Sequence, residues 1–288
     1  MGELLKVEHL HKKVGAFELS DINLKLESGY IMGIVGMNGA GKTTLIQTLL
    51  NLRQKDSGSV YIGGYSLDTQ EKKAKDMTAF VLDGSLFEPS MTVLQNARHY
   101  GMLYDHFQEE LFCRICERFS LPLHKKLRSL STGFVTRFQL AFALSHQASL
   151  YLMDEPASGL DPLFRRQLLT IMQELVEDGT RSVLFSTHIT EDLDQVGDYI
   201  VLLNHGKIYL DMDMESLRDR YRIYYGSREQ IDGLQHPDIL YREHRESRSM
   251  VFAQTTHGIE RMAAELTEQT PVLEDILYYL EKGGHLDA

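Results

Sequence analysis

Hydrophobic positions in this chain form short apolar runs that alternate with longer amphipathic segments. Apolar runs of about four to eight residues are typical of buried strands, whereas apolar residues spaced three and four apart are typical of helices. Their alternation predicts a three-layer α/β domain. We expect strands over residues 4–7, 22–26, 31–35, 60–62, 79–82, 150–153, 183–186 and 199–203, a hairpin turn at 204–207, and helices over 42–50, 93–102, 108–119, 134–146, 163–178 and 191–196.

The composition changes near residue 214, which predicts a second domain. Residues 1–213 contain 12 Lys and 9 Arg, whereas residues 214–288 contain 1 Lys and 8 Arg. We therefore expect a main domain over 1–213 and a small accessory α+β domain over 214–288. The last helix is expected over 272–281, between Pro271 and the glycines that follow it.

Charge and cysteine usage limit the expected partners and compartment. The formal net charge is −11, and nucleic-acid-binding proteins usually carry a basic patch, so no nucleic-acid partner is expected. The two cysteines, Cys113 and Cys116, suit a reducing compartment. No window approaches about 18 consecutive apolar residues, and the first residues lack the pattern of a secretory signal. A cytosolic chain without a membrane span of its own is therefore expected.

A glycine-rich segment directly follows the expected strand 31–35. Residues Gly36 to Thr43 match the pattern G-x-x-x-x-G-K-[ST], and a helix-forming run comes next. Glycines let successive backbone N–H groups turn inward around phosphate oxygens, and the start of the helix adds its positive end. The alternative is a chance glycine-rich turn, but the strand before it and the helix after it argue against this interpretation. The expected phosphate ligands are Gly36, Asn38, Gly39, Ala40, Gly41, Lys42, Thr43 and Thr44.

Two carboxylates follow the apolar run 150–153. Asp154 and Glu155 would lie at the carboxyl edge of a parallel sheet, where such folds bind ligands. Asp154 is expected to hold Mg²⁺ together with Thr43, and Glu155 to polarise the attacking water. A solvated strand end explains such a pair equally well when it stands alone, but the phosphate loop in the same sheet favours a catalytic site.

Further motifs give the chain a specific family resemblance. Leu130-Ser131-Thr132-Gly133-Phe134, with Arg137 and an Ala-containing helix after it, resembles the signature segment of ATP-binding cassette (ABC) ATPases. Asp154-Glu155-Pro156 followed by Ser158-Gly159-Leu160-Asp161 resembles the second acidic motif and D-loop, and His188 resembles the switch histidine of that family. The resemblance covers residues 4–213 and implies a P-loop NTPase three-layer core with an antiparallel β subdomain and a helical subdomain at about 84–146.

The resemblance also implies a mechanism. ATP bound by the phosphate loop of one subunit would be capped by Ser131 and Gly133 of a second, opposed subunit, and hydrolysis would release this dimer. Glu155 and His188 would be catalytic, with His188 contacting the γ-phosphate. Taken alone, Ser131 is more simply a helix cap and His188 a surface residue at a strand end.

Four positions depart from the family pattern. Thr132 and Phe134 replace a glycine and a glutamine of the signature segment. Asp83 stands where the Q-loop glutamine usually lies, and we expect it to be a third magnesium ligand beside Thr43 and Asp154. Val14 stands where an aromatic residue commonly stacks on adenine, and Phe17 is the candidate substitute.

The resulting prediction is an ATP-hydrolysing ABC transporter subunit, most like the exporters of the ABC-2 type. Its expected cofactors are ATP and Mg²⁺, and its expected partners are transmembrane permease subunits and a second ATPase subunit, identical or paralogous. Such a chain would be peripheral on the cytoplasmic face of the membrane, associated only through the permease. The alternative is a soluble non-transport ABC ATPase that acts as an assembly or regulatory factor.

Overall fold

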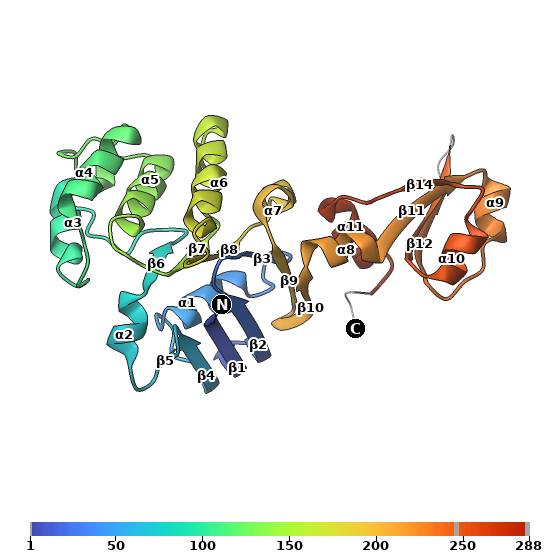
Figure 1. The fold of residues 1–288 in the computed structure, drawn as a ribbon, viewed down its shortest axis with the longest axis horizontal. Coiled ribbons are helices and arrows are strands. Elements are labelled where there is room, and N and C mark those ends of the chain that lie inside the picture. Colours follow the sequence, from blue (N-terminus) through green and yellow to red (C-terminus); the bar gives the residue numbers. More distant parts are fainter. Residues whose placement is uncertain (1, 245–247, 286–288) are drawn as a thin grey trace. The chain divides into compact units, whose positions relative to one another are not determined.

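The computed structural model describes residues 2–244 and 248–285 and divides into two compact units (Figure 1). The first unit comprises Met1–His188 and Tyr199–Leu210, and the second comprises Ile189–Asp198 and Asp211–Ala288. The predicted boundary after residue 213 lies close to the division between Leu210 and Asp211. Segment 189–198 differs from the prediction, because it groups with the C-terminal unit rather than with the main domain.

The first unit is built around a six-stranded sheet with the order β10-β9-β3-β8-β7-β6. The five strands from β9 to β6 in this order are parallel to one another. β3, β7 and β8 are buried at every residue, which is why each contains a run of consecutive apolar residues. The bounds are β3 Ile31–Val35, β6 Thr78–Val81, β7 Leu150–Asp154, β8 Ser182–Ser186, β9 Tyr199–Asn204 and β10 Lys207–Asp213.

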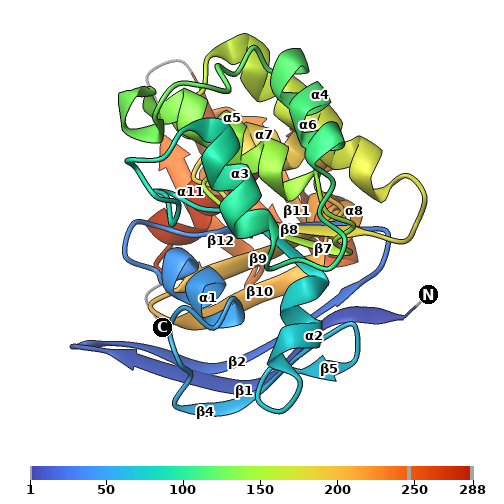
Figure 2. The ribbon, with the colours of Figure 1, turned by 90° about the vertical axis from the view of Figure 1, so that its left-hand side faces the viewer.

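A second sheet in this unit is antiparallel and has the order β2-β1-β4-β5. Its strands are β1 Glu3–Val14, β2 Phe17–Glu27, β4 Ser57–Ile62 and β5 Tyr65–Ser66. β1 and β2 are much longer than predicted. Apart from the buried Leu10 and Leu19, their outer residues are exposed or half-buried while they pair along the hairpin, so they lack a continuous apolar signature. Helix α1, Lys42–Leu49, lies between the two sheets, and its Leu45, Ile46 and Leu49 join one buried core with residues of both (Figure 2).

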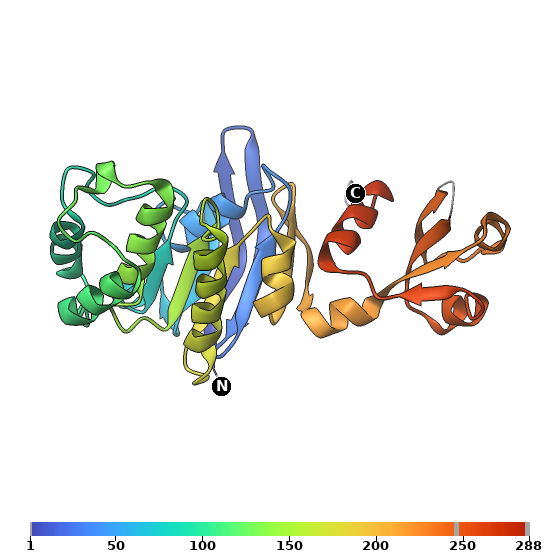
Figure 3. The same cartoon turned by 90° about the horizontal axis from the view of Figure 1, so that it is seen from above.

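Helices α3, α4 and α5 form a separate group within the first unit (Figure 3). Their core is aromatic: the Phe87 ring lies 4.7 Å from that of Phe138 and 5.0 Å from that of Phe142. Helix α5 begins two residues before its predicted first residue. It ends three residues before its predicted last residue, because the chain closes there with the Ser145 N–H donating to the Phe142 carbonyl. The bounds are α2 Glu71–Asp76, α3 Val93–Gly101, α4 Glu109–Arg118, the 3₁₀ turn Leu127–Ser129, α5 Thr132–Ala143 and α6 Pro162–Val176.

The second unit is an α+β fold, as predicted. Its antiparallel sheet has the order β12-β13-β11-β14, and β13 is buried on both faces. Phe252 on one face meets Tyr279 of α11, while Val251 on the other joins a cluster with α9 and α10. The bounds are α7 Thr190–Val196, α8 Met214–Arg220, β11 Tyr221–Gly226, α9 Arg228–Gly233, β12 Ile239–His244, β13 Ser249–Gln254, α10 His257–Met262, β14 Thr267–Gln269 and α11 Leu273–Lys282.

Most other predicted elements are present with ends shifted by a few residues. The predicted hairpin turn between β9 and β10 is present, with Gly206 and, rather than Asn204, His205 at positive φ. Asp161 caps α6 by accepting from the Phe164 N–H, and Pro162 occupies the first helical position. Within the described residues, none of the helices combines the length and apolar character that a membrane span requires.

Candidate functional site

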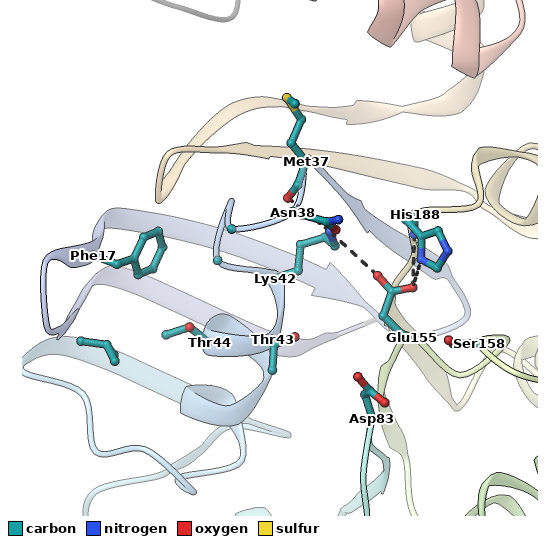
Figure 4. A pocket seen from close by; sticks show the side chains of 13 residues that line it. Phe17, Met37, Asn38, Lys42, Thr43, Thr44, Asp83, Glu155, Ser158 and His188 are labelled. Carbon is teal, nitrogen blue, oxygen red and sulfur yellow. Dashed lines mark hydrogen bonds and ion pairs between the residues drawn. The ribbon is translucent and has the colours of Figure 1, made fainter. Parts of the chain in front are cut away.

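A cavity of about 520 Å³ opens at the carboxyl edge of the parallel sheet (Figure 4). Strands β3, β8, β7 and β6 are consecutive in the sheet, so the segments that follow them converge there. This volume lies within the range of about 300–1,000 Å³ that is usual for small-molecule sites. The cavity is lined by Val14, Phe17, Met37, Asn38, Gly39, Gly41, Lys42, Thr43, Thr44, Asp83, Glu155, Ser158 and His188.

The phosphate loop connects β3 to α1 in the predicted way. Gly39 and Gly41 have φ values of 86° and 110°, which favour glycine. A Cβ atom at Gly41 would lie 2.5 Å from the Phe17 ring, so the loop also needs glycine for space. The Lys42 ammonium is buried and donates to the Gly36 carbonyl over 2.7 Å. The lysine therefore folds back over its own loop, at the wall of the cavity.

Asp154 is the buried acid at the end of β7. Its Oδ1 accepts hydrogen bonds from the Ser186 hydroxyl at 2.7 Å and the Thr43 hydroxyl at 3.2 Å. Its Oδ2 is buried without a hydrogen-bond partner among the described residues. Burial raises the pKa of Asp154, and the two hydroxyl donors oppose this shift. A buried carboxylate oxygen without a partner next to a threonine hydroxyl fits a hard divalent cation such as Mg²⁺.

Glu155 follows at a φ of 48°, a backbone conformation that non-glycine residues rarely adopt. Its N–H donates to the Ser186 hydroxyl, so Ser186 joins the two acidic residues. Its carboxylate accepts from His188 Nδ1 at 2.6 Å and lies 3.9 Å from the Lys42 ammonium. Figure 4 shows the Glu155 carboxylate between these two side chains. The carboxylate is thus held at the cavity by Lys42, at the start of α1, and by His188, which follows β8.

Ser131 and Gly133 are both described, and neither belongs to the lining of this cavity. Ser131 is exposed and occupies the position before α5, but its side chain makes no capping hydrogen bond. The simpler interpretation of Ser131 as a side-chain helix cap is therefore wrong. A Cβ at Gly133 would lie 3.1 Å from the Gly159 carbonyl, so α5 begins against the loop that precedes α6.

The departures from the family pattern have structural counterparts. Phe134 is half-buried, with the Arg137 guanidinium 5.0 Å over its ring, and Arg137 bonds to Asp161. Asp83 is exposed and lines the cavity, on the side that carries Glu155. Val14 and Phe17 also line it, which leaves Phe17 as the aromatic residue available to a base.

The sequence interpretation missed two residues of this region. Ser186 is fully buried and bonds to both Asp154 and Glu155. A hydroxyl residue at the end of a buried apolar run was the available signal. Gln139 is a buried amide on α5 that bonds to the backbone beside Asp83. A lone glutamine in an otherwise apolar helical stretch was the corresponding signal.

The fold and the phosphate loop define a P-loop nucleotide-binding protein. Residues 19–158 match the family model described as ABC transporter, and residues 124–194 match one described as an AAA domain, putative AbiEii toxin, Type IV TA system. The uncharacterized ABC transporter ATP-binding protein YdbJ of Bacillus subtilis is 31% identical, over 74% of this chain and 70% of that protein. The chain therefore belongs to the ABC transporter ATP-binding proteins, and it is an ATP-binding ATPase subunit.

Other relatives and solved structures agree with this assignment. The linearmycin resistance ATP-binding protein LnrL of B. subtilis is 29% identical, over 71% of this chain and 68% of its own length. The bacitracin transport ATP-binding protein BcrA of Bacillus licheniformis is 26% identical, over 78% and 74%. A solved ATP-binding subunit of an ABC transporter has a TM-score of 0.68 and 26% identity, over 75% of this chain and 92% of that one. These likenesses confirm the predicted fold class.

Proposed function

We propose that this chain powers export through separate membrane subunits, by ATP-driven closure and opening of a dimer of cassettes on the cytoplasmic face of the membrane. Two relatives with named tasks, in bacitracin transport and linearmycin resistance, support export. The observation that carries the dimer mechanism is the exposed Ser131 at the start of α5, whose side chain makes no bond to its own helix.

The phosphate loop would hold the triphosphate of ATP. In this arrangement Lys42 exchanges its bond to the Gly36 carbonyl for phosphate oxygens, and the backbone of residues 36–41 donates to the same group. Thr43, Asp154 and Asp83 would hold Mg²⁺, which supplies positive charge against the phosphates. The unpartnered Oδ2 of Asp154 supports this assignment.

Glu155 would be the general base that takes a proton from the attacking water. Its carboxylate is accessible from the cavity, and His188 Nδ1 and the Lys42 ammonium fix its direction. His188 therefore orients the base, and its exposed ring can also contact the γ-phosphate. Ser186 bonds to both the backbone of Glu155 and the carboxylate of Asp154, so it fixes the position of one relative to the other.

Ser131 and Gly133 would cap the ATP that a facing cassette binds. The first N–H groups of a helix attract anions, and an exposed hydroxyl beside them adds a donor. The loop 158–161 contacts the same helix through Gly133 and Arg137. The capping tip and this loop are therefore mechanically connected within one subunit.

The membrane subunits would contact an apolar groove beside the helical group. The groove has a volume of about 210 Å³, and its lining includes Leu86, Phe87, Tyr100 and Leu103. Leu86 and Leu103 are 50% and 69% exposed, and the adjacent Met102 is 77% exposed. Contiguous exposed apolar side chains of this kind typically mark an interaction surface.

A site-specific crosslinking experiment tests the proposal. A photo-reactive residue at Leu103 is expected to capture a membrane subunit in native membranes, and the same residue at Lys25, exposed on β2, is expected not to. Capture of a soluble protein from position 103, with no membrane protein, would favour the alternative of an assembly or regulatory ATPase.

A further inference from the structure

Gln139 of α5 is a buried amide, 1% exposed, that bonds to the backbone following β6. Its Oε1 accepts from the Leu82 N–H at 3.1 Å, and its Nε2 donates to the carbonyls of Leu82 at 3.0 Å and Gly84 at 2.9 Å. One side chain therefore satisfies three backbone groups on the two sides of Asp83. A buried side chain with all these partners has little rotational freedom left.

The same short segment is attached to α5 a second time. Phe87 is buried, and its ring packs edge-on against Phe138 and Phe142 of α5. Residues 82–87 are thus fixed to this helix at both ends, through an amide at one end and a ring at the other. Asp83 lies between the two attachments, with its side chain at the phosphate cavity.

Helix α5 also begins directly after Ser131. The helix that presents the proposed capping serine is therefore the one to which the Asp83 segment is fastened. We propose that Gln139 is a positioning residue that holds Asp83 at the metal side of the cavity and makes Asp83 and Ser131 move as one body. This inference rests on the proposed function for the role of Asp83 as a magnesium ligand.

Closure of a dimer would then act on both nucleotides at once. When α5 brings Ser131 toward the ATP of the facing subunit, Gln139 carries Asp83 with it relative to the subunit's own phosphate loop. If Gln139 only stabilised the fold, its removal would weaken the local backbone structure. The Mg²⁺ dependence of ATPase activity would then stay unchanged. The two interpretations therefore differ in a measurable quantity.

The first experiment measures hydrogen exchange in the nucleotide-free full chain. Gln139→Met keeps the length of the side chain but leaves three backbone groups without partners. We expect the Leu82 amide to exchange at least about tenfold faster. Ser145→Ala removes a buried hydroxyl bond to the Ala141 carbonyl, just beyond the end of α5, and should leave that exchange unchanged. Unaltered exchange at Leu82 in Gln139→Met would overturn the proposal.

The second experiment measures the Mg²⁺ concentration that gives half-maximal ATPase activity. Groups that orient a metal ligand typically change metal affinity roughly 10–100-fold when removed, so a rise of about tenfold is expected for Gln139→Met and for Asp83→Ala. The double variant should resemble Asp83→Ala alone, because Gln139 acts through Asp83.

Additive effects in the double variant, or a normal Mg²⁺ response in Gln139→Met, would overturn the proposal. So would an Asp83→Ala variant with an unchanged response. Loss of the proposed transport role would instead appear as failed capture of a membrane subunit from position 103. If Gln139→Met does not fold, Gln139→Glu repeats both tests, since it keeps the acceptor for Leu82 and loses the donor.

Discussion

His188 Nδ1 lies 2.6 Å from Oε2 of Glu155, and the backbone N–H of His188 donates to the same oxygen at 3.3 Å. The two residues come from the ends of neighbouring strands, β7 and β8. Glu155 reaches this position through a left-handed backbone conformation that a non-glycine residue holds at some energetic cost. The backbone conformation of Glu155 therefore directs its carboxylate into the cavity, and His188 holds it there.

Glu155→Gln should keep ATP binding and slow hydrolysis by at least about 100-fold, the usual scale for losing a general base. The amide retains the size of the side chain and can still bond to His188. Single-turnover hydrolysis and equilibrium binding of ATP to the same preparation measure the two effects separately. Hydrolysis within a few-fold of the unsubstituted chain would remove Glu155 from this role.

Ser131→Ala should leave the stability of the isolated subunit nearly unchanged, because the Ser131 side chain makes no capping bond. Thr92→Ala is the matched control: Thr92 caps α3 with both bonds of a capping box, and its loss should cost about 1 kcal/mol. Urea unfolding compares the two variants. Ser131→Ala should nevertheless weaken the ATP-dependent dimer. If Ser131→Ala and Thr92→Ala lowered the unfolding free energy equally, Ser131 would be only a helix cap.

Asp154→Asn should stabilise the nucleotide-free protein increasingly as the pH rises. Burial raises the pKa of Asp154 above its ordinary value of 3.8, so its contribution to stability is present at low pH and is lost as the pH rises through the folded-state pKa. Asparagine does not titrate, so the stability of the variant does not fall with pH for this reason. Unfolding free energies from about pH 4 to pH 7 test the trend.

Asp161→Asn provides the control of opposite sign for that experiment. The Phe164 N–H that Asp161 accepts, together with Arg137, lowers the pKa of Asp161. The stability that Asp161 contributes is therefore present at neutral pH and lost as the pH falls. For Asp154→Asn, the gain in unfolding free energy over the unsubstituted protein should widen as the pH rises. A gain that becomes smaller with rising pH would contradict the assignment of Asp154 as a buried carboxyl whose charged form is disfavoured.

Phe17→Ala should weaken ATP binding roughly tenfold, within the range of about 1–3 kcal/mol that stacking of a base on an aromatic ring contributes. Inorganic tripolyphosphate has no base, so its affinity should not change. Calorimetric titration of both ligands gives the comparison. An equal loss for tripolyphosphate would mean that Phe17 supports the loop through Gly41, whose position its ring crowds.

Much of this site could be predicted from the sequence because its residues follow strands whose burial is evident. The phosphate loop follows the fully buried strand β3, and the two acids stand at the end of the fully buried strand β7. Their positions therefore follow from the parallel sheet. The bond between Ser186 and both acids depends on which strands are neighbours in the sheet, and the sequence does not specify that order. Gln139 was missed for a similar reason, since its partners are backbone groups more than 50 positions away.

The long hairpin of β1 and β2 shows another limit. Apart from the buried Leu10 and Leu19, its outer residues are exposed or half-buried, so hydrogen bonding between the strands contributes more to their structure than burial does. The grouping of residues 189–198 with the C-terminal unit likewise depends on tertiary contacts, such as the Leu273 N–H donating to Asp194. Composition along the chain carries no trace of such contacts.

Sedimentation velocity of Glu155→Gln with saturating Mg²⁺ and ATP tests the central claim most directly. If ATP held by one phosphate loop is capped by Ser131 of a facing cassette, the preparation should sediment as a dimer with ATP and as a monomer without it. The additional substitution Ser131→Ala should return it toward the monomer. A preparation that binds ATP yet remains monomeric, both alone and with any cassette that co-purifies with it, would contradict the account.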